Sequence, residues 1–251
     1  AQIDNGSSDV CGIASLSINT SSFTCSDVGN NVVTLTVTDN NGNESTETAT
    51  VTVEDATAPT PISQDITIQL DNTGNATITA EQIDNGSSDV CGISTITVSP
   101  NAFSCSDIGA NAVTLTVTDV NGNQTSTDAI VTVEDTIAPN VITQDLTVQL
   151  DLDGNATLSA AQVDNGSTDA CGISSLAIDQ TLFTCDNLGT NSVLLTVTDT
   201  NGNQASANAT ITVEDTIAPI ADLANLPDIN VTDLSKVIKY HYAPCDDTSE
   251  V

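Results

Sequence analysis

The sequence repeats one short motif at a constant interval. The motif reads IDNGSSDVCGI at residues 3–13 and 83–93, and it returns as VDNGSTDACGI at 163–173. Both intervals are 80 residues. Because self-similarity at a fixed period sets the architecture before any local pattern does, the chain is predicted to be a tandem array. The predicted domains are a first repeat at 1–57 that lacks its opening strands, complete repeats at 58–137 and 138–217, and a segment at 218–251 that begins a fourth repeat or serves as a donor-strand tail.

Apolar and polar residues alternate along the complete second repeat. Residues 65–71 read DITIQLD and residues 112–119 read AVTLTVTD, with turn-forming Asn, Gly and Asp residues between such segments. Alternation with a period of two predicts strands that have one face in the core. A second strand is expected to continue through Ile78 to Ala80, and helical periodicity appears nowhere. Six or seven short strands in each 80-residue repeat predict an all-β fold of tandem immunoglobulin-like antiparallel β-sandwich repeats.

The chain is strongly acidic. It holds 34 Asp and Glu residues against two cationic side chains, Lys236 and Lys239, for a net charge of -32. Such a charge repels nucleic acid and anionic membranes and attracts cations. No run of about 18 apolar residues occurs, so no membrane span is predicted. A salt-adapted surface and a surface loaded with divalent metal both fit this composition.

Seven cysteines follow the same period. They form the pairs Cys11 and Cys25, Cys91 and Cys105, and Cys171 and Cys185, each within one repeat, and Cys245 is left over. This regular usage predicts disulfides inside each repeat and an oxidising, extracellular or cell-surface location. A bridge that closes so short a loop contributes about 3 kcal/mol in the chain-entropy model. Zinc binding is disfavoured because no CxxC motif and no histidine accompany the pairs. Cys245 is expected to be free, bonded between chains, or paired with a residue outside this sequence.

Acidic residues gather where one repeat meets the next. Strand parity brings the IDNGSSDVCG loop and the DxNGN hairpin to the end of the repeat where the previous repeat's last acids arrive. Calcium binds six to eight oxygens from carboxylates, amides and the backbone. The predicted calcium ligands are therefore Glu54, Asp55, Asp84, Asp89, Asp119 and Asn121 at one junction and Glu134, Asp135, Asp164, Asp169, Asp199 and Asn201 at the next. The alternative, that these residues only cap turns, does not account for an acid pair beside every linker.

Three segments of each repeat resemble the hyalin repeat of extracellular proteins. In the first repeat they are SDVCGI at 8–13, FTCSDVGNNVVTLTVTDNNGNES at 23–45 and TATVTVED at 48–55. The resemblance implies an immunoglobulin-like adhesion or stalk module of a large tandem-repeat surface protein of bacterial type, without enzymatic activity. Hyalin repeats usually place a second cysteine after the GN hairpin, whereas here it lies earlier, so the family's disulfide topology is not carried over. The linkers VEDATAP and VEDTIAP also resemble cadherin junctions, where acids at a strand end share calcium with the next domain.

We expect a non-enzymatic extracellular structural protein that forms a cell-surface stalk or pilus-like filament. His241 is the only histidine, and neither a nucleophile with its base nor a phosphate loop can be assembled. Residue 1 corresponds to residue 81, so the first repeat is expected to expose an apolar groove and an unpaired edge. If the tail from residue 218 fills that groove in a second subunit, the chain forms a homopolymer. Otherwise these ends are cut points in a longer chain.

The alternative function is an adhesin whose repeats bind carbohydrate or another cell surface. Exposed aromatic side chains would favour it, but aromatics make up only 2% of the chain. The DTI triplets at Thr136 and Thr216 resemble a bacterial O-glycosylation motif, and Asn-x-Ser/Thr sequons are frequent. These threonines are therefore candidate glycosylation sites, and surface glycans are candidate partners.

Overall fold

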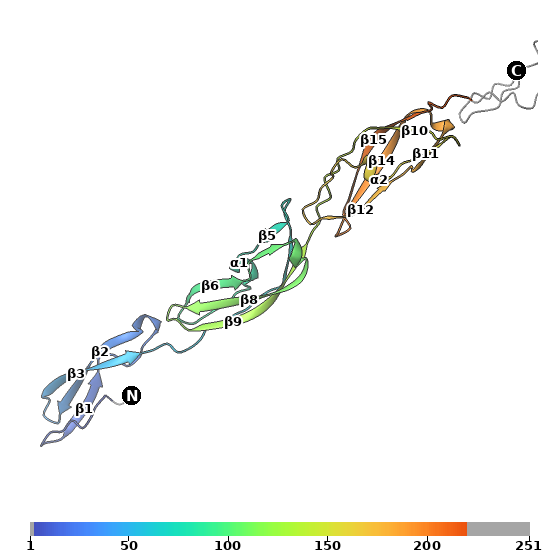
Figure 1. Cartoon of the computed structure of the whole chain (residues 1–251). Helices are drawn as coiled ribbons and strands as arrows, with labels where there is room; N and C mark the ends of the chain where they lie inside the picture. Colours follow the sequence, from blue (N-terminus) through green and yellow to red (C-terminus); the bar gives the residue numbers. More distant parts are fainter. Residues whose placement is uncertain (1–2, 220–251) are drawn as a thin grey trace, which may run out of the picture. The chain divides into compact units, whose positions relative to one another are not determined.

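The computed structural model describes residues 3–219. These residues form β-strands joined by turns and by very short helices, which confirms the predicted all-β sandwich fold (Figure 1). No helix in the described part of the chain is long and apolar enough to cross a membrane. The predicted fourth-repeat start or donor tail lies, from residue 220 onward, outside the described residues, and so does Cys245.

The described chain divides into two compact units whose boundary passes through the second repeat. The first unit comprises Ala1–Thr67, Thr77–Ala102 and Gly109–Thr132. The second comprises Ile68–Ala76, Phe103–Ile108 and the chain from Val133 onward. One end of the second repeat therefore groups with the third repeat, so a compact unit is not the same as a sequence repeat.

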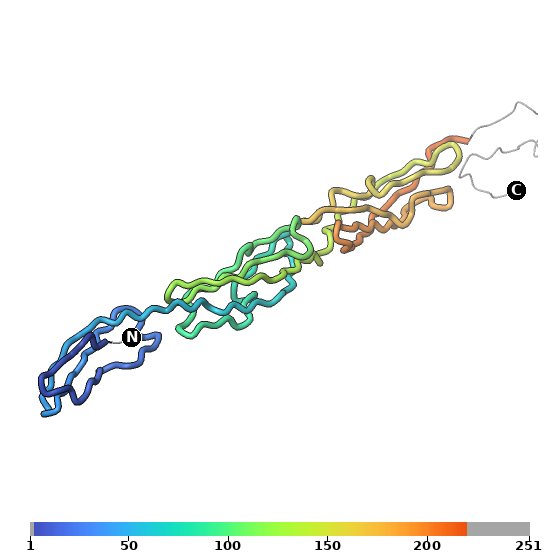
Figure 2. Tube along the Cα trace, turned by 90° about the horizontal axis from the view of Figure 1, so that it is seen from below, coloured from blue at the N-terminus to red at the C-terminus, as the bar shows by residue number. Residues whose placement is uncertain are grey.

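The third repeat shows the complete strand order. Its larger sheet has the order β10-β15-β14-β12, and its smaller sheet pairs β11 with β13. The strands are β10 (Leu146–Gln149), β11 (Asn155–Thr157), β12 (Ile173–Ile178), β13 (Leu182–Thr184), β14 (Gly189–Asp199) and β15 (Gln204–Glu214). The last two form the long hairpin predicted around the NGN turn, and they pair antiparallel from Gly189↔Val213 to Thr198↔Gln204 (Figure 2).

One strand pairing departs from the expected antiparallel pattern. β10 pairs with β15 in parallel, from Leu146↔Ile211 to Gln149↔Glu214. Asp145 supports the start of this pairing, because its Oδ1 accepts a hydrogen bond from the Thr210 N–H at 2.7 Å. The first strand of a repeat thus pairs with the edge of the last strand. Alternation along the sequence does not specify whether such a pairing is parallel or antiparallel.

Ala80 and its counterpart do not continue a strand, contrary to the sequence prediction. Each begins a one-turn helix, α1 (Ala80–Ile83) in the second repeat and α2 (Ala160–Val163) in the third. The Gln82 Oε1 accepts a hydrogen bond from the Thr79 N–H at 2.8 Å, and Thr79 and Gln82 form a capping box that the third repeat reproduces. This box satisfies amide groups at the start of the helix, so the alternation ends at Ile78.

The two complete repeats bury the same apolar positions, except that Ala156 is buried whereas its counterpart Ala76 is partly exposed. The inward residues of β14, Val193, Leu195 and Val197, are 0% exposed, as their alternation predicts. The rest of this core is Leu150, Ala156, Leu158, Val163, Phe183, Ala209, Ile211 and Val213. The buried apolar residues of the second repeat are Leu70, Ile78, Ile83, Phe103, Val113, Leu115, Val117, Ala129, Val131 and Val133.

The second repeat has the same strand order as the third. Its sheets are β4-β9-β8-β6 and β5-β7. The strands are β4 (Ile66–Gln69), β5 (Asn75–Thr77), β6 (Ile93–Ser99), β7 (Ala102–Ser104), β8 (Gly109–Asp119) and β9 (Gln124–Glu134). In all three repeats a 3-10 turn begins at the second cysteine, η1 (Cys25–Asp27), η2 (Cys105–Asp107) and η3 (Cys185–Asn187).

The first repeat is a three-stranded sheet of β1 (Ile13–Ile18), β2 (Gly29–Asp39) and β3 (Glu44–Val53). Its described residues include no counterpart of β4 or β5. Residues 22–24, which correspond to β7 and β13, accordingly form no strand. Val33 is fully buried, whereas Leu35 and Val37 are partly exposed although their counterparts in the other repeats are 0% exposed. One face of this sheet is therefore incompletely covered.

Candidate functional site

Each linker places one aspartate just after the last strand of a repeat. The Oδ1 of Asp55 accepts a hydrogen bond from the Thr57 N–H, and the Oδ1 of Asp135 accepts one from the Ile137 N–H, both at 3.0 Å. Their other oxygens, Asp55 Oδ2 and Asp135 Oδ2, are buried and have no hydrogen-bond partner within the described structure. A buried, unpaired carboxylate oxygen is costly unless a cation or a hydrogen-bond donor reaches it.

A second aspartate comes from the repeated loop of the following repeat. Asp169 Oδ1 accepts hydrogen bonds from the backbone N–H groups of Cys171 at 2.8 Å and Gly172 at 3.1 Å. Asp89 makes the same two contacts with Cys91 and Gly92, at 2.7 and 3.1 Å. Local backbone contacts thus fix both loops and hold one oxygen of each carboxylate.

These aspartates meet in pairs at the junctions. One ligand atom each of Asp55, Asp89 and Cys91 lies within 4.8 Å of the others, and the same holds for Asp135, Asp169 and Cys171. No Lys or Arg occurs before Lys236 to neutralise either pair. Two carboxylates this close repel each other unless a cation lies between them.

The donor atoms at each junction suit a hard divalent cation. Carboxylate oxygens are the preferred ligands of Ca²⁺. The neighbouring sulfurs of Cys91 and Cys171 are in disulfides, so they are not the thiolates that zinc and softer metals require. Asp55 with Asp89, and Asp135 with Asp169, therefore fit a calcium ion better than a soft metal.

The predicted disulfides within single repeats are wrong. Cys25 is bonded to Cys91 and Cys105 to Cys171, so each bridge crosses from one repeat to the next over a sequence separation of 66. The two cysteines of one repeat serve different junctions. Cys91, before β6, is bonded to the preceding repeat, whereas Cys105, after β7, is bonded to the following one.

The remaining cysteines extend the same pattern. Cys11 occupies the position of Cys91 and Cys171, and it is an exposed free thiol. Cys185 occupies the position of Cys25 and Cys105, and it too is disulfide-bonded. Each internal bridge thus joins the 3-10 turn of one repeat to the repeated loop of the next.

The other predicted calcium ligands lie outside the paired aspartates. Asp164 accepts hydrogen bonds from the Ser167 hydroxyl and N–H, and these hydrogen bonds lower the pKa of Asp164. Asp84 makes the corresponding turn with Ser87. Glu54 and Glu134 are exposed, and Glu134 Oε2 accepts a hydrogen bond from Gln69 Nε2 at 2.7 Å. The carboxylates of Asp84 and Asp164 are therefore engaged in turns.

The hairpin acids contact the linkers indirectly, through the side chain of a neighbouring asparagine. Asp119 is almost fully buried, and its two oxygens accept hydrogen bonds from the N–H groups of Asn121 and Asn123 at 2.8 Å and from Asn123 Nδ2 at 2.7 Å. The same Nδ2 donates to the Asp55 carbonyl at 3.1 Å. In the next junction Asp199 accepts from the N–H of Asn201 and from Asn203, and Asn203 donates to the Asp135 carbonyl. The hairpin therefore braces the linker, while its carboxylate stays with its own turn.

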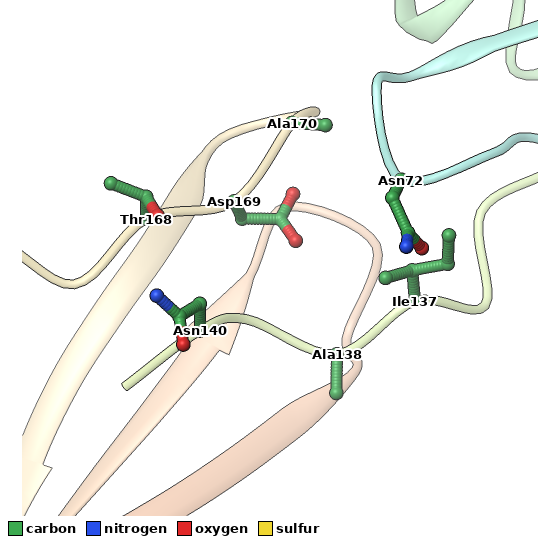
Figure 3. Close-up of a pocket in the computed structure, with 7 residues that line it drawn as sticks. All are labelled: Asn72, Ile137, Ala138, Asn140, Thr168, Asp169 and Ala170. Carbon is green, nitrogen blue, oxygen red and sulfur yellow. The ribbon is translucent and has the colours of Figure 1, made fainter. Parts of the chain in front are cut away.

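A surface pocket of about 500 Å³ lies beside Asp169 (Figure 3). The turn after β4, the linker and the repeated loop contribute its lining residues, which are Asn72, Ile137, Ala138, Asn140, Thr168, Asp169 and Ala170. Figure 3 shows the Asp169 carboxylate directed into the space between these segments. The pocket gives water and small cations access to Asp169 of the second aspartate pair.

The candidate glycosylation sites hold hydrogen bonds. The Thr136 hydroxyl donates to Gln69 Oε1 at 2.9 Å, and the Thr216 hydroxyl donates to Gln149 Oε1 at 3.1 Å. Both contacts are exposed, so their glycosylation stays a prediction.

No protein-family model matches the sequence, and no curated protein matches it. Several solved structures of extracellular cadherin domains are similar to it. The protocadherin gamma C5 EC1-3 structure has a TM-score of 0.36 and 14% identity, covering 75% of this chain and 79% of that one. A mouse clustered protocadherin structure, PcdhgC3 EC1-3, has a TM-score of 0.33 and 14% identity, and the match covers 74% of this chain and 77% of that one. The human mucin-like protocadherin EC1-2 structure has a TM-score of 0.34 and 14% identity, and the match covers 64% of this chain and 100% of that one. At these TM-scores neither the fold nor the function of this chain is inferred from them, and the hyalin-repeat resemblance stays a prediction.

Proposed function

We propose that this chain is a non-enzymatic extracellular structural protein whose linked β-sandwich repeats form a cell-surface stalk or filament. The observation that carries the proposal is that both described bridges, Cys25–Cys91 and Cys105–Cys171, join consecutive repeats. A bridge inside a repeat stabilises that repeat, whereas a bridge between repeats also limits how far they separate under load. Such bridges suit a protein that transmits force along an array, and they persist in an extracellular setting.

Calcium is the second part of the proposal. Asp55 with Asp89 and Asp135 with Asp169 would hold the ion, together with water and backbone oxygens. The ion would supply positive charge between two like-charged carboxylates from consecutive repeats. The buried oxygens of Asp55 and Asp135 support this assignment, since residues 3–219 supply neither of them with a hydrogen-bond donor. Calcium removal would then leave repulsion at every junction and loosen the array.

Head-to-tail strand complementation is the proposed mode of assembly. Among the described strands, β3 is the edge strand of the first repeat, whereas its counterpart β15 in the third repeat pairs with β10 in parallel. The chain after Pro219 holds DINV at residues 228–231, which repeats the DITI and DLTV patterns at 65–68 and 145–148. In a neighbouring copy, this segment would take the place of β4 or β10 against the first repeat. Such a contact between unlike surfaces is heterologous, and if it does not close on itself it builds an open polymer.

Electron microscopy of the purified chain, with and without residues 220–251, tests the assembly. The full chain is expected to form filaments in calcium, and the shortened chain is expected to remain monomeric while its second repeat melts unchanged. Filaments formed equally well by the shortened chain would contradict strand complementation. The adhesin alternative stays a prediction; of the described phenylalanines, Phe103 and Phe183 are buried and Phe23 is partly exposed.

A further inference from the structure

The Cys105–Cys171 bridge ends beside the second aspartate pair. The Sγ atom of Cys171 lies within 4.8 Å of one carboxylate oxygen each of Asp135 and Asp169. We propose that this bridge positions the pair for calcium, so that calcium binding and the resistance of the bridge to reduction are coupled. The inference rests on the proposed function, because it assigns a redox control to the calcium site proposed there.

Each end of the bridge shares a repeat with one aspartate of the pair. Asp135 directly follows β9 and Cys105 begins η2, so both belong to the second repeat. Asp169 and Cys171 lie together in the repeated loop of the third repeat, where Asp169 Oδ1 accepts hydrogen bonds from the N–H groups of Cys171 and Gly172. The covalent bond therefore limits how far Asp169 can move away from Asp135.

A second connection holds the same loop to the linker. The backbones of Asn140 and Thr168 exchange two N–H to carbonyl hydrogen bonds, at 2.8 and 3.0 Å. This contact lies one residue before Asp169, and the bridge lies two residues after it. With the bridge the loop is held on both sides of Asp169, and without the bridge it is held on one side. Reduction should therefore widen the range of Asp135–Asp169 distances without freeing the loop completely.

The turn between β4 and β5 packs against both the bridge and the loop. Cys105 Sγ lies 3.8 Å from the Gly74 carbonyl oxygen. A Cβ on Gly74 would lie 2.6 Å from Cys105 Sγ and 3.4 Å from the Ala170 Cβ, so glycine is needed for this close approach. The turn, the bridge and the residue that follows Asp169 are thus in contact. A change at the bridge therefore reaches the loop that carries Asp169.

The charges at this junction give calcium two opposite effects on reduction. Asp135 Oδ2 is buried without a hydrogen-bond donor among the described residues, and the nearby carboxylates repel the thiolate that attacks the bridge. Calcium lessens this repulsion and so speeds the attack. At equilibrium, however, if the bridged form binds calcium more tightly, calcium favours the bridged form by the same factor. The equilibrium, and not the rate, therefore tests the coupling.

A dithiol such as dithiothreitol is the reductant in this equilibrium. Its two thiols give up two electrons and two protons and close to a cyclic disulfide. The S–S bond between Cys105 and Cys171 breaks, and each sulfur becomes a thiol. Calcium is neither oxidised nor reduced, so it acts only through its different affinities for the two forms of the protein.

Equilibration of the full chain with mixtures of reduced and oxidised dithiothreitol measures the coupling. Free thiols are alkylated, and Asp-N digestion places Cys171 as the one cysteine of residues 169–178. Compared with EDTA, saturating calcium is expected to raise the ratio of reduced to oxidised dithiothreitol at half-reduction of Cys171 about 10-fold, or about 30 mV for this two-electron couple. An unchanged or lowered ratio would overturn the inference.

The Asp135→Asn variant is the matched control for this titration. It keeps the bridge and removes one carboxylate of the pair, so the effect of calcium on Cys171 should disappear. The Cys25–Cys91 bridge of the same variant should keep its own calcium effect, because Asp55 and Asp89 are unchanged. An undiminished shift at Cys171 in Asp135→Asn would show that calcium acts elsewhere, and it would overturn the inference.

Calcium calorimetry separates this inference from the proposed function. The Cys105→Ser/Cys171→Ser variant should bind calcium at this junction about 10-fold more weakly than the parent, by the same linkage. Equal affinity in the two proteins would overturn the coupling and leave the calcium proposal in place. A parent chain that binds no calcium would overturn both. Because the dithiothreitol titration uses the parent chain, it decides the question even if the double variant does not fold.

Discussion

One carboxylate oxygen of Asp135 lies within 4.8 Å of one of Asp169, although the two residues belong to consecutive repeats. The Asp135 Oδ2 atom is buried without a hydrogen-bond partner in the described structure, and the Cys105–Cys171 bridge is beside the pair. A covalent link and an uncompensated charge pair thus occupy one junction. The bridge keeps the carboxylates close, and under the proposed function a cation would lie between them.

The Asp135→Asn substitution is expected to stabilise the protein slightly without calcium and to destabilise it in saturating calcium. In EDTA the variant should melt slightly above the parent, because it removes repulsion between Asp135 and Asp169. In saturating calcium it should melt below the parent, because a ligand at 100 times its Kd contributes about 2.7 kcal/mol. Calorimetry in both buffers measures this, with Asp153→Asn as a control that removes one exposed charge outside the pair. Equal calcium increments in the parent and Asp135→Asn would show that this pair binds no calcium.

The fold could be predicted well from the sequence, because the strands of each repeat follow from local alternation of apolar and polar residues. Alternation in residues 112–119 places Val113, Leu115 and Val117 in the core, and the structure confirms this. Alternation does not predict strand direction, and it did not reveal the parallel pairing of β10 with β15. The helical turn at Ala80 was also missed, although the Thr79-x-x-Gln82 capping box was visible in the sequence.

Reduction is expected to lengthen the chain in single-molecule pulling. The Cys105–Cys171 bridge locks a loop with a sequence separation of 66, and an extended chain of that length spans roughly 220 Å. Each bridge therefore keeps about this length out of the measured contour length, and the contour length should increase by this amount when dithiothreitol reduces the bridge. The Cys105→Ser/Cys171→Ser double variant should show one such gain without reductant. Contour lengths unaffected by reductant would contradict bridges between repeats.

Leu35→Ala and Leu115→Ala form a matched pair of core truncations. Leu115 is 0% exposed, so its loss should cost about 2–5 kcal/mol. Leu35 is partly exposed in the first repeat, so its loss should cost less than half as much in the unassembled chain. Urea unfolding measures both. In filaments the difference between the two stability losses should become smaller, because a donor strand would cover Leu35. A difference that stays constant would argue against complementation.

Acid is expected to destabilise the complete repeats through their hairpin aspartates. Burial opposes ionisation of Asp119, but hydrogen bonds from Asn123 and from backbone N–H groups outweigh it and lower its pKa from its ordinary value of 3.8. Since the folded pKa is below the unfolded one, this stability is fully present above about pH 4. It is lost as the pH falls through the folded pKa.

The Asp119→Asn variant checks that pH dependence. It should melt lower at pH 7, because its amide would place a donor against Asn123 Nδ2, and it should lose less stability than the parent below pH 4. Melting temperatures from pH 7 to pH 2 measure both effects, with Asp153→Asn as the control. An acid transition identical to that of the parent would show that Asp119 does not contribute.

The candidate site was only partly predictable from the sequence. Acids beside every linker pointed to Asp55, Asp89, Asp135 and Asp169, which the structure does bring into pairs. Sequence proximity, however, suggested that Cys91 bonds Cys105. The observed Cys25–Cys91 and Cys105–Cys171 bridges exclude that pairing, and alternation along the sequence does not specify which cysteines meet.

Peptide mapping without reductant tests the central claim, that bridges join consecutive repeats. Asp-N digestion places Cys11 and Cys25 in residues 9–26, Cys91 and Cys105 in 89–106, and Cys171 in 169–178. Bridges between repeats would hold these three peptides together in one species that reduction separates. Bridges within repeats would instead leave 9–26 and 89–106 as separate, internally closed peptides, and that result would contradict the account.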